Sequence, residues 1–228
     1  MNCLDSYCHS ARTLAKQCHG LSGLDSGQLN VKKRSNQNPK EIRKAIREAR
    51  LAVPKPYASQ ASAKFVERIV ELEWYQNANR IAAYLPFNGE ADPLPFMDRA
   101  ILDGKQVFVP VIVAKGEPLK FEGWTRETRV RTNRFDIREP ELSADEISPK
   151  ELDVVITPLV AFDAQRNRLG VGGGYYDRTF AFLNGVATDE RQPILVGLAY
   201  EMQRIKKINA KPHDVKLDAV VSESGILS

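Results

Sequence analysis

Residues 168–178 read RLGVGGGYYDR, with four glycines in five positions between Arg168 and Asp177. Glycine lets the backbone take positive φ angles and approach a ligand closely, because no Cβ intervenes. An apolar run at residues 154–156 lies upstream and predicts a buried strand, and the amphipathic segment 175–183 predicts a helix. When a strand, a glycine-rich turn and the first turn of a helix follow one another, their backbone N–H groups can point at a phosphate. The segment therefore indicates a phosphate site, with Arg168 as its cation and Asp177 as a carboxylate for magnesium.

The glycine-rich segment alone leaves an alternative open. No Gly-Lys-Ser/Thr follows it, so it is not a P-loop, and its spacing is not the G-x-G-x-x-G of dinucleotide-binding folds. A glycine-rich turn that lets a helix pack tightly on a sheet would have the same composition. The segment by itself favours phosphate binding without identifying the ligand.

Apolar runs and helical patterns alternate along the rest of the chain. We expect strands at residues 81–85, 107–109, 119–124 (an edge strand), 154–158, 194–198 and 219–221, and helices at 39–53, 59–76, 93–102 and 175–183. Runs without strict polar alternation are typical of strands buried on both faces. The chain is therefore predicted to be an α/β protein, a Rossmann-like three-layer domain with a largely parallel sheet flanked by helices. Ligands of such sheets bind beyond the carboxyl ends of the strands, here at residues 86–92, 162–174 and from 200 onward.

The composition predicts one domain with an N-terminal tail. The 228 residues fit one medium domain, and a hydrophobic content of 43% is enough for a core. Residues 1–38 are rich in Ser, Asn, Gln and Lys and predict a flexible tail before a domain at 39–228. Most of the net charge of +4 comes from this tail, so the domain is not expected to bind nucleic acid. No apolar run approaches the ~20 residues that span a bilayer.

The cysteines and most of the histidines also lie in the tail, at Cys3, Cys8, Cys18, His9 and His19. The predicted domain therefore has neither a disulfide framework nor thiolate catalysis. The two Cys-His pairs match no zinc-finger or zinc-ribbon spacing, which favours an ordinary flexible tail over a metal site. We expect a cytoplasmic protein, with the organelle matrix as the alternative if the acid-poor tail is a transit peptide.

Two charged residues outside the glycine-rich segment could take part in binding. Glu90 directly follows the predicted strand at 81–85, where a carboxylate could accept paired hydrogen bonds from an aminopyrimidine-type ring. Arg43 lies on the basic first helix. Each residue has a simpler interpretation: a solvated loop glutamate, or a solvated helix face that Arg43 shares with other basic residues such as Arg50.

The full string at 168–178 closely resembles the signature of the 5-formyltetrahydrofolate cyclo-ligases, also called methenyltetrahydrofolate synthetases. The resemblance extends from about residue 40 to residue 221. It implies ATP-dependent conversion of 5-formyltetrahydrofolate to 5,10-methenyltetrahydrofolate, with release of ADP and phosphate. Phosphorylation of the formyl oxygen and attack by N10 would achieve this without a side-chain nucleophile. The implied ligands are ATP, a reduced folate and Mg²⁺; we expect a monomer with no membrane or nucleic-acid partner.

The resemblance also implies which residues form each site. The ATP site would contain Lys40, Arg43, Arg168, Leu169, Gly170, Val171, Gly172, Gly173, Gly174, Tyr175 and Tyr176. The folate site would contain Leu85, Glu90, Phe135 and Tyr175, and the magnesium ligands would be Asp177 and Asp214. Carboxylate and phosphate oxygens are the ligands that Mg²⁺ prefers. Phe135 has the alternative interpretation of a buried core aromatic, and His213 is expected to neighbour the site without acting as a base.

Two positions depart from the family pattern. The first member of the family's N-terminal basic pair would fall on Pro39, which leaves Lys40 one residue out of register. Some relatives carry lysine where this chain has Gly173. Any charge needed at that point must then come from elsewhere, for example from Arg168 or Lys40.

Two other classes of protein remain as alternatives. A sugar-phosphate isomerase or CoA-transferase relative would share the sheet architecture, because fold alone does not decide function. It would need a catalytic glutamate or a Lys/Asp pair at the strand ends, without Tyr-Tyr-Asp after a glycine run. A nucleic-acid-binding protein would instead work through the basic tail, and its binding would weaken steeply with salt.

Overall fold

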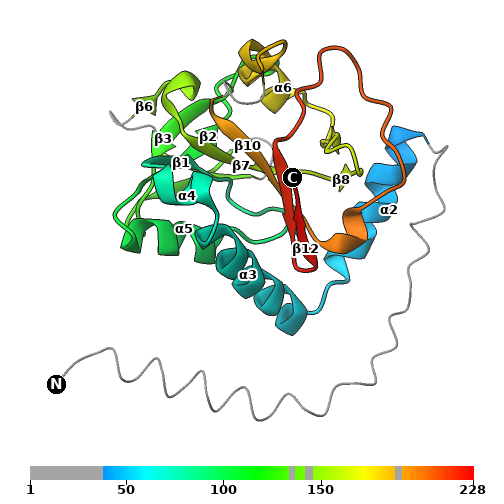
Figure 1. Ribbon diagram of the computed structural model, residues 1–228, viewed down its shortest axis with the longest axis horizontal. Helices are drawn as coiled ribbons and strands as arrows, with labels where there is room; N and C mark the ends of the chain where they lie inside the picture. The colour runs from blue at the N-terminus through cyan, green and yellow to red at the C-terminus, as the bar shows by residue number, and fades with distance from the viewer. Residues whose placement is uncertain (1–37, 134–136, 142–145, 188–191) are drawn as a thin grey trace. The chain divides into compact units, whose positions relative to one another are not determined.

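The computed structural model describes residues 38–133, 137–141, 146–187 and 192–228. Its centre is an eight-stranded sheet in the order β12-β11-β10-β7-β1-β2-β3-β6 (Figure 1). The strands are β1 (Arg80–Ala82), β2 (Gln106–Val111), β3 (Lys120–Gly123), β6 (Glu146–Ile147), β7 (Val154–Pro158), β10 (Ile194–Leu198), β11 (Ala219–Ser222) and β12 (Gly225–Leu227). Every strand predicted from the sequence is present in this sheet.

The five central strands, from β11 to β2, all pair in parallel. The three outer strands β12, β3 and β6 pair antiparallel to their neighbours. The prediction of a largely parallel sheet is therefore confirmed. The prediction of an edge strand at 119–124 is wrong, because the two-residue strand β6 pairs with the outer side of β3. Strands as short as β6 and β12 carry too few residues for a recognisable pattern.

The two faces of the sheet bury different apolar sets, because side chains alternate along a strand. Val154 and Ile156 of β7 face a cluster with helices α3 (Lys55–Val70), α4 (Glu73–Asn77) and α5 (Leu94–Leu102). Val155 faces the opposite cluster, which includes Phe180 and Leu183 beside the short helix α6 (Tyr175–Thr179). Helices thus flank both faces, as the continuous apolar strands predict.

The predicted helices are present, with two differences in length. The expected helix at 59–76 is two helices, because Leu72 is extended (φ −82°, ψ 137°) and the chain turns before α4. That turn buries Tyr75 against Phe96 of α5. The expected helix at 175–183 is the five-residue α6 followed by a 3₁₀ turn at Ala181–Leu183. Among the described residues, no helix is long and apolar enough to cross a membrane.

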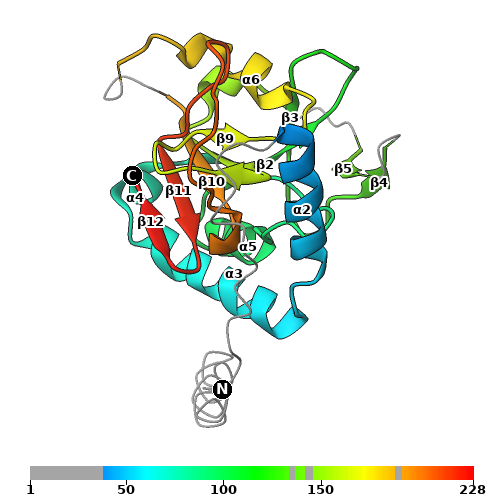
Figure 2. The ribbon, with the colours of Figure 1, turned by 90° about the vertical axis from the view of Figure 1, so that its right-hand side faces the viewer.

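Helix α2 (Pro39–Leu51) begins where the sequence predicts. The Asn38 side chain accepts a hydrogen bond from the Lys40 N–H at 3.1 Å, and Pro39 occupies the first turn. Ile42 and Ile46 on its apolar stripe are buried against Val160 and Ile205. The helix therefore packs on the segment that follows β7 and lies beside it in Figure 2.

A small hairpin separates β7 from the glycine-rich segment. Its strands β8 (Ala161–Phe162) and β9 (Arg168–Leu169) pair antiparallel outside the main sheet. A second two-stranded sheet joins β4 (Val130–Thr132) to β5 (Arg138–Pro140). The glycine-rich segment thus follows a hairpin strand, which the sequence analysis did not predict between the strand at 154–158 and the helix. The hairpin contributes only two residues per strand, too few to be visible as an apolar run.

Candidate active site

The candidate site lies where the order of the parallel strands reverses. Chain order runs from β1 outward to β2 on one side, while β7 and β10 lie on the other side of β1. Loops that leave the carboxyl ends of the strands on either side of such a point form a crevice for ligands. Here the segment after β1 leads to Glu90, and the segment after β7 leads through the hairpin to the glycine-rich loop. The first two of the three segments that the sequence indicated, 86–92 and 162–174, therefore leave strands on either side of this point.

One buried carboxylate holds the hairpin that presents the glycine-rich loop. Asp163 is fully buried, and its oxygens accept the N–H groups of Gln165 and Asn167 at 3.0 Å and of Ile208 at 2.8 Å. These bonds tie the turn of the hairpin to the segment that runs toward Asp214. Because the hairpin is fixed in this way, the loop that follows β9 starts from a rigid base.

The glycine-rich loop, residues 170–174, uses backbone angles that favour glycine. Gly172 has φ +111° and Gly174 has φ +65°. A Cβ on Gly173 would lie 2.7 Å from the Tyr175 ring, so the ring occupies the place that a side chain would need. Residues 171–173 are exposed, which leaves the loop backbone open to a ligand. Helix α6 has only five residues, so its dipole adds little and the loop itself supplies the N–H groups.

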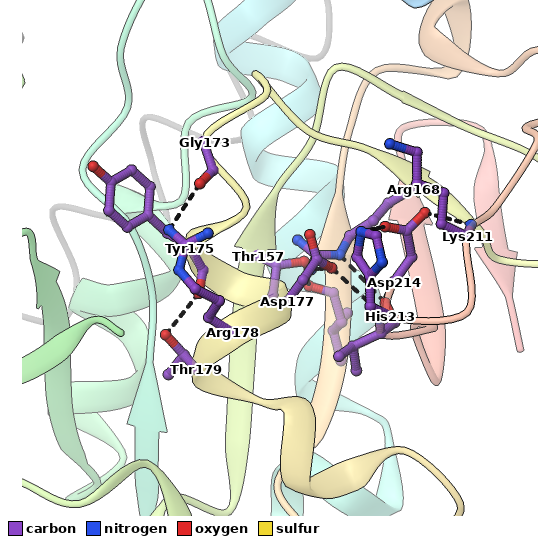
Figure 3. A network of polar contacts seen from close by, with 12 residues as sticks. Thr157, Arg168, Gly173, Tyr175, Asp177, Arg178, Thr179, Lys211, His213 and Asp214 are labelled. Carbon is purple, nitrogen blue, oxygen red and sulfur yellow. Dashed lines mark hydrogen bonds and ion pairs between the residues drawn. The ribbon is translucent and has the colours of Figure 1, made fainter. Parts of the chain in front are cut away.

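Two arginines fix the loop through its carbonyl oxygens. Arg43 of α2 donates from Nε to the Gly170 carbonyl at 2.8 Å, and its guanidinium lies beside Gly172. Arg178 of α6 donates from Nη2 to the Gly173 carbonyl at 2.8 Å and lies over the Tyr175 ring (Figure 3). The structure thus brings Arg43, one of the residues predicted for the ATP site, into contact with the loop. Arg178 was not assigned a role from the sequence, although it closes the same RLGVGGGYYDR string.

Lys40, one turn before Arg43, is exposed. Its backbone N–H caps the helix through Asn38. No described residue accepts a hydrogen bond from its side chain. The structure therefore places Lys40 on the correct helix without connecting it to the loop, and its expected role in ATP binding stays a prediction.

Arg168 and Asp177 form a short ion pair behind the loop. Arg168 Nη2 lies 2.6 Å from Asp177 Oδ1, and the guanidinium also lies over the Tyr176 ring at 5.4 Å. The same Asp177 oxygen accepts the Val215 N–H at 3.2 Å. Arg168 is buried while the Asp177 side chain is 25% exposed, and the pair holds the start of α6 against the 211–215 segment.

The second predicted metal ligand lies on that 211–215 segment. Asp214 Oδ2 accepts the Lys211 N–H at 2.8 Å, and Oδ1 lies 3.7 Å from His213 Nε2. Figure 3 shows Asp177, His213 and Asp214 grouped on one side of α6. The described residues contain no cluster of three or more metal-ligating side chains. The structure places the two aspartates on the same side of α6, and Asp177 contacts the segment of Asp214 through the Val215 N–H.

Glu90 occupies the other side of the site. Its Oε2 accepts the Phe87 N–H at 3.1 Å, and its Oε1 lies 3.8 Å from Arg50 Nη1. Burial raises the pKa of Glu90 to about 7, although the Arg50 charge and the Phe87 N–H both act to lower it. Leu85, the other residue of this segment that was predicted to contact the folate, is also buried. A carboxylate in this setting is a strong acceptor for a ligand's N–H groups.

Tyr176 connects the two sides of the site. Burial raises the pKa of its phenol, and the charges of Arg168 and Glu90 both act on it. The phenol therefore lies within electrostatic reach of the loop-side arginine and of the Glu90 carboxylate. Of the remaining predicted residues, Leu169 and Val171 lie on β9 and the loop tip, and Tyr175 begins α6. Phe135 lies outside the described residues.

Arg50 is a charged residue to which the sequence interpretation assigned no role. It was named only among the basic residues of the alternative in which this face of α2 is solvated, yet it is only 4% exposed. Its Nη1 donates to the Leu159 carbonyl at 3.4 Å, and its Nε has no hydrogen-bond partner among the described residues. Burial lowers the pKa of Arg50, while the Glu90 charge acts to raise it. A signal existed: Arg50 is eight residues after Ile42 and so falls on the buried stripe of the helix.

Together these features define a class of protein. A mostly parallel α/β sheet carries a glycine-rich loop held by arginines, and a largely buried carboxylate, at its switch point. This is the arrangement of an enzyme that binds a phosphate-bearing ligand beside a second polar ligand. The model of the 5-formyltetrahydrofolate cyclo-ligase family matches residues 35–223. The chain belongs to this family of enzymes.

Individual relatives agree with the family match. A 5-formyltetrahydrofolate cyclo-ligase of Escherichia coli K12 is 34% identical over 184 residues, which cover 79% of this chain and 98% of the relative. A mitochondrial 5-formyltetrahydrofolate cyclo-ligase of Arabidopsis thaliana is 25% identical over 209 residues, 82% of this chain and 74% of the relative. The structure of Aquifex aeolicus 5,10-methenyltetrahydrofolate synthetase matches with a TM-score of 0.69 at 24% identity, and covers 82% of this chain and 91% of that chain. The last likeness supports the fold.

Proposed function

We propose that the chain catalyses the ATP-dependent conversion of 5-formyltetrahydrofolate to 5,10-methenyltetrahydrofolate, with release of ADP and phosphate. Family membership supports the reaction class. The observation that carries the proposal is Tyr176, whose ring lies 5.4 Å from the Arg168 guanidinium and on whose phenol the Glu90 charge also acts. A nucleotide phosphate on the loop side and a pterin on the carboxylate side would meet at this residue.

The folate side of the proposal rests on Glu90. An aminopyrimidine-type ring presents neighbouring N–H groups, and an ionised carboxylate can accept two of them at once. Glu90 is already held by the Phe87 N–H, which fixes the orientation of the carboxylate. Leu85, Tyr175 and Phe135 would supply the apolar surface against the pterin.

The ATP side rests on the glycine-rich loop. Backbone N–H groups of residues 170–174 would bind phosphate oxygens, and Arg43 and Arg168 would neutralise their charge. Lys40 could reach the same phosphates from the first turn of α2. Leu169, Val171, Tyr175 and Tyr176 would pack around the nucleotide. The braces from Arg43 and Arg178 to the loop carbonyls keep the N–H groups in place before ATP arrives.

The chemistry overcomes a poor electrophile. The N5-formyl carbon is amide-like and is deactivated by its nitrogen. Transfer of the γ-phosphoryl group to the formyl oxygen breaks the bond to ADP and turns that oxygen into a leaving group. N10 then attacks the formyl carbon and loses its proton, the C–O bond breaks, and phosphate departs with the former formyl oxygen. The protein's part is to position the reactants and to neutralise charge, so no side-chain nucleophile is needed.

The residues at the site fit a magnesium ion. Asp177 and Asp214 are carboxylates on segments joined by the Val215 bond, and Mg²⁺ is commonly held by one or two carboxylates together with substrate phosphates. We propose these two residues as its protein ligands. When bound, the ion would neutralise phosphate charge during the transfer.

The test is to mix the purified chain with ATP, magnesium and 5-formyltetrahydrofolate and to follow the methenyl chromophore. The proposal expects product only when all three are present, and none when a chelator exceeds the magnesium. A folded protein that forms no product would contradict the proposal. Salt-sensitive RNA or DNA binding in its place would favour the nucleic-acid alternative.

Localisation and assembly are further parts of the proposal. We propose a cytoplasmic monomer, with the organelle matrix as the alternative because a relative is named mitochondrial. Microscopy of the full-length chain fused at its C-terminus to a fluorescent protein separates the two compartments. Light scattering after size exclusion measures the mass in solution, and a mass near 25.6 kDa corresponds to a monomer.

A further inference from the structure

Helix α2 contributes two arginines to the site, two turns apart. Arg43 and Arg50 are seven residues apart, so they lie on nearly the same face of the helix. Arg43 contacts the glycine-rich loop through the Gly170 carbonyl. Arg50 contacts Glu90, on the other side of the site. The helix therefore touches both of the segments that would bind the two substrates.

The turn that carries Glu90 is docked against the end of α2. Asn88 and Gly89 have positive φ angles of 49° and 71°. A Cβ on Gly89 would lie 2.8 Å from the Arg50 carbonyl oxygen, so the two backbones are in direct contact there. The Glu90 carboxylate then has two neighbours: the Phe87 N–H on Oε2 and the Arg50 guanidinium on the side of Oε1.

The charged and titratable groups that act on Glu90 come from three elements. Arg50 lies on α2, Tyr84 on the segment after β1, and Tyr176 on α6. The Tyr84 hydroxyl donates to the Ala91 carbonyl, so it is committed elsewhere. Within the described ranges, Arg50 is thus the cation that faces this carboxylate. Its Nε has no hydrogen-bond partner there although the side chain is buried.

We propose that Arg50 is a positioning residue for Glu90, which fixes the orientation and the negative charge of the carboxylate that recognises the folate. This inference rests on the proposed function, because it assumes that Glu90 accepts hydrogen bonds from the substrate. A substrate that donates N–H groups binds the ionised carboxylate. The affinity for this substrate should therefore fall as the pH drops below the pKa of Glu90. The charge of Arg50 should set the pH at which the affinity begins to fall.

The test measures the dissociation constant of 5-formyltetrahydrofolate by calorimetry from pH 6 to pH 9. For the wild type we expect weaker binding below about pH 7, the pKa of Glu90 in this environment. Arg50→Gln removes the facing charge, which should raise the pKa of Glu90 by about one unit or more and weaken binding about fivefold at pH 7, with little change at pH 9. Arg50→Lys retains a charge and should restore most of the wild-type profile.

Matched controls separate positioning from general damage. Arg47→Gln removes an exposed charge from the same helix and should leave the profile unchanged. In a Glu90→Gln background, Arg50→Gln should produce no further pH dependence. A lower melting temperature for Arg50→Gln with an unchanged pH profile would mean that the arginine is structural only, and would overturn the proposal.

A wild-type measurement covers the case in which Arg50→Gln does not fold. In ¹⁵N-arginine-labelled protein, the Arg50 Nε resonance, assigned from its loss in Arg50→Lys, should shift with the same pH midpoint as folate affinity. An Nε resonance that does not respond across this range would overturn the inference. Failure of the proposed function is recognised separately, since the wild type would then neither bind nor convert 5-formyltetrahydrofolate.

Discussion

At the scale of single residues, the site depends on a few side chains in demanding environments. The sequence identified Arg43, Glu90 and the glycines from their positions after predicted strands or within a resemblance. It could not place Arg50, because a charged residue on a helix stripe is most often solvated. Its burial depends on a carbonyl and a carboxylate from segments 109 and 40 residues away in the chain, which no local pattern contains.

Gly172 is the residue whose backbone most limits substitution in the loop. Its φ of +111° disfavours any side chain, although the nearest atoms to a Cβ would be the Arg43 guanidinium at an ordinary 3.6 Å. We expect Gly172→Val to cost about 1–3 kcal/mol of stability through strain. It should lower turnover by about tenfold or more, because aligned N–H donors to the phosphates are lost. Melting curves and ATP-saturated turnover measure the two effects.

Gly104→Val is the matched control for this prediction. Gly104 also has positive φ (+78°) and nothing within 4 Å of a Cβ, but it lies in the turn after α5. The Gly104→Val variant should lose a comparable amount of stability and keep the wild-type turnover. If both variants keep full turnover, the glycine-rich loop is a packing turn and the ATP assignment fails.

The raised pKa of Glu90 also predicts how the free energy of unfolding depends on pH. Its pKa is about 7 in the folded protein against 4.5 for the free group, so the folded state binds more protons between these pH values. The contribution of Glu90 to stability is therefore largest below about pH 4.5 and is lost as the pH rises through about 7. The unfolding free energy of the wild type relative to Glu90→Gln should fall by about 2–3 kcal/mol from pH 5 to pH 8. Urea titrations at both pH values measure this difference, and an equal difference at both would contradict it.

At the scale of elements, apolar runs and caps predicted most of the sheet and the start of α2. They could not predict the hairpin β8–β9 or the break between α3 and α4. The hairpin is held by one buried aspartate, Asp163. The break between the helices is stabilised by the burial of Tyr75 against α5. Both depend on contacts between distant segments, and these override local propensity.

Helix α2 should connect folding stability to the site, because its apolar face holds both arginines in position. Ile46 is fully buried against Val160, Ala161 and Ile205. We expect Ile46→Ala to cost about 2–5 kcal/mol of stability and to raise the KM for ATP as the helix loosens. Leu51→Ala on the same helix removes a side chain that is 61% exposed, and should change stability by less than about 0.5 kcal/mol. Chemical denaturation and steady-state kinetics of both variants check this; equal losses would contradict it.

At the scale of the whole molecule, residues 38–228 contain the described core, the sheet and the candidate site. Helix α2 carries its own cap at Asn38, so it does not need preceding residues to begin. We expect a chain that starts at residue 37 to melt cooperatively and to keep most of its turnover. Loss of the cooperative transition, or of most of the turnover, would show that residues 1–36 belong to the working enzyme.

In the proposed reaction, ATP cleavage is coupled to ring closure at one site. The most direct measurement follows ADP and the methenyl product together, in one reaction of the wild-type chain with magnesium, ATP and 5-formyltetrahydrofolate. Because phosphoryl transfer to the formyl oxygen precedes ring closure, we expect one ADP for each methenyl product and no ADP when the folate is omitted. Methenyl product without ADP, or ADP formed equally fast without the folate, would contradict this coupling.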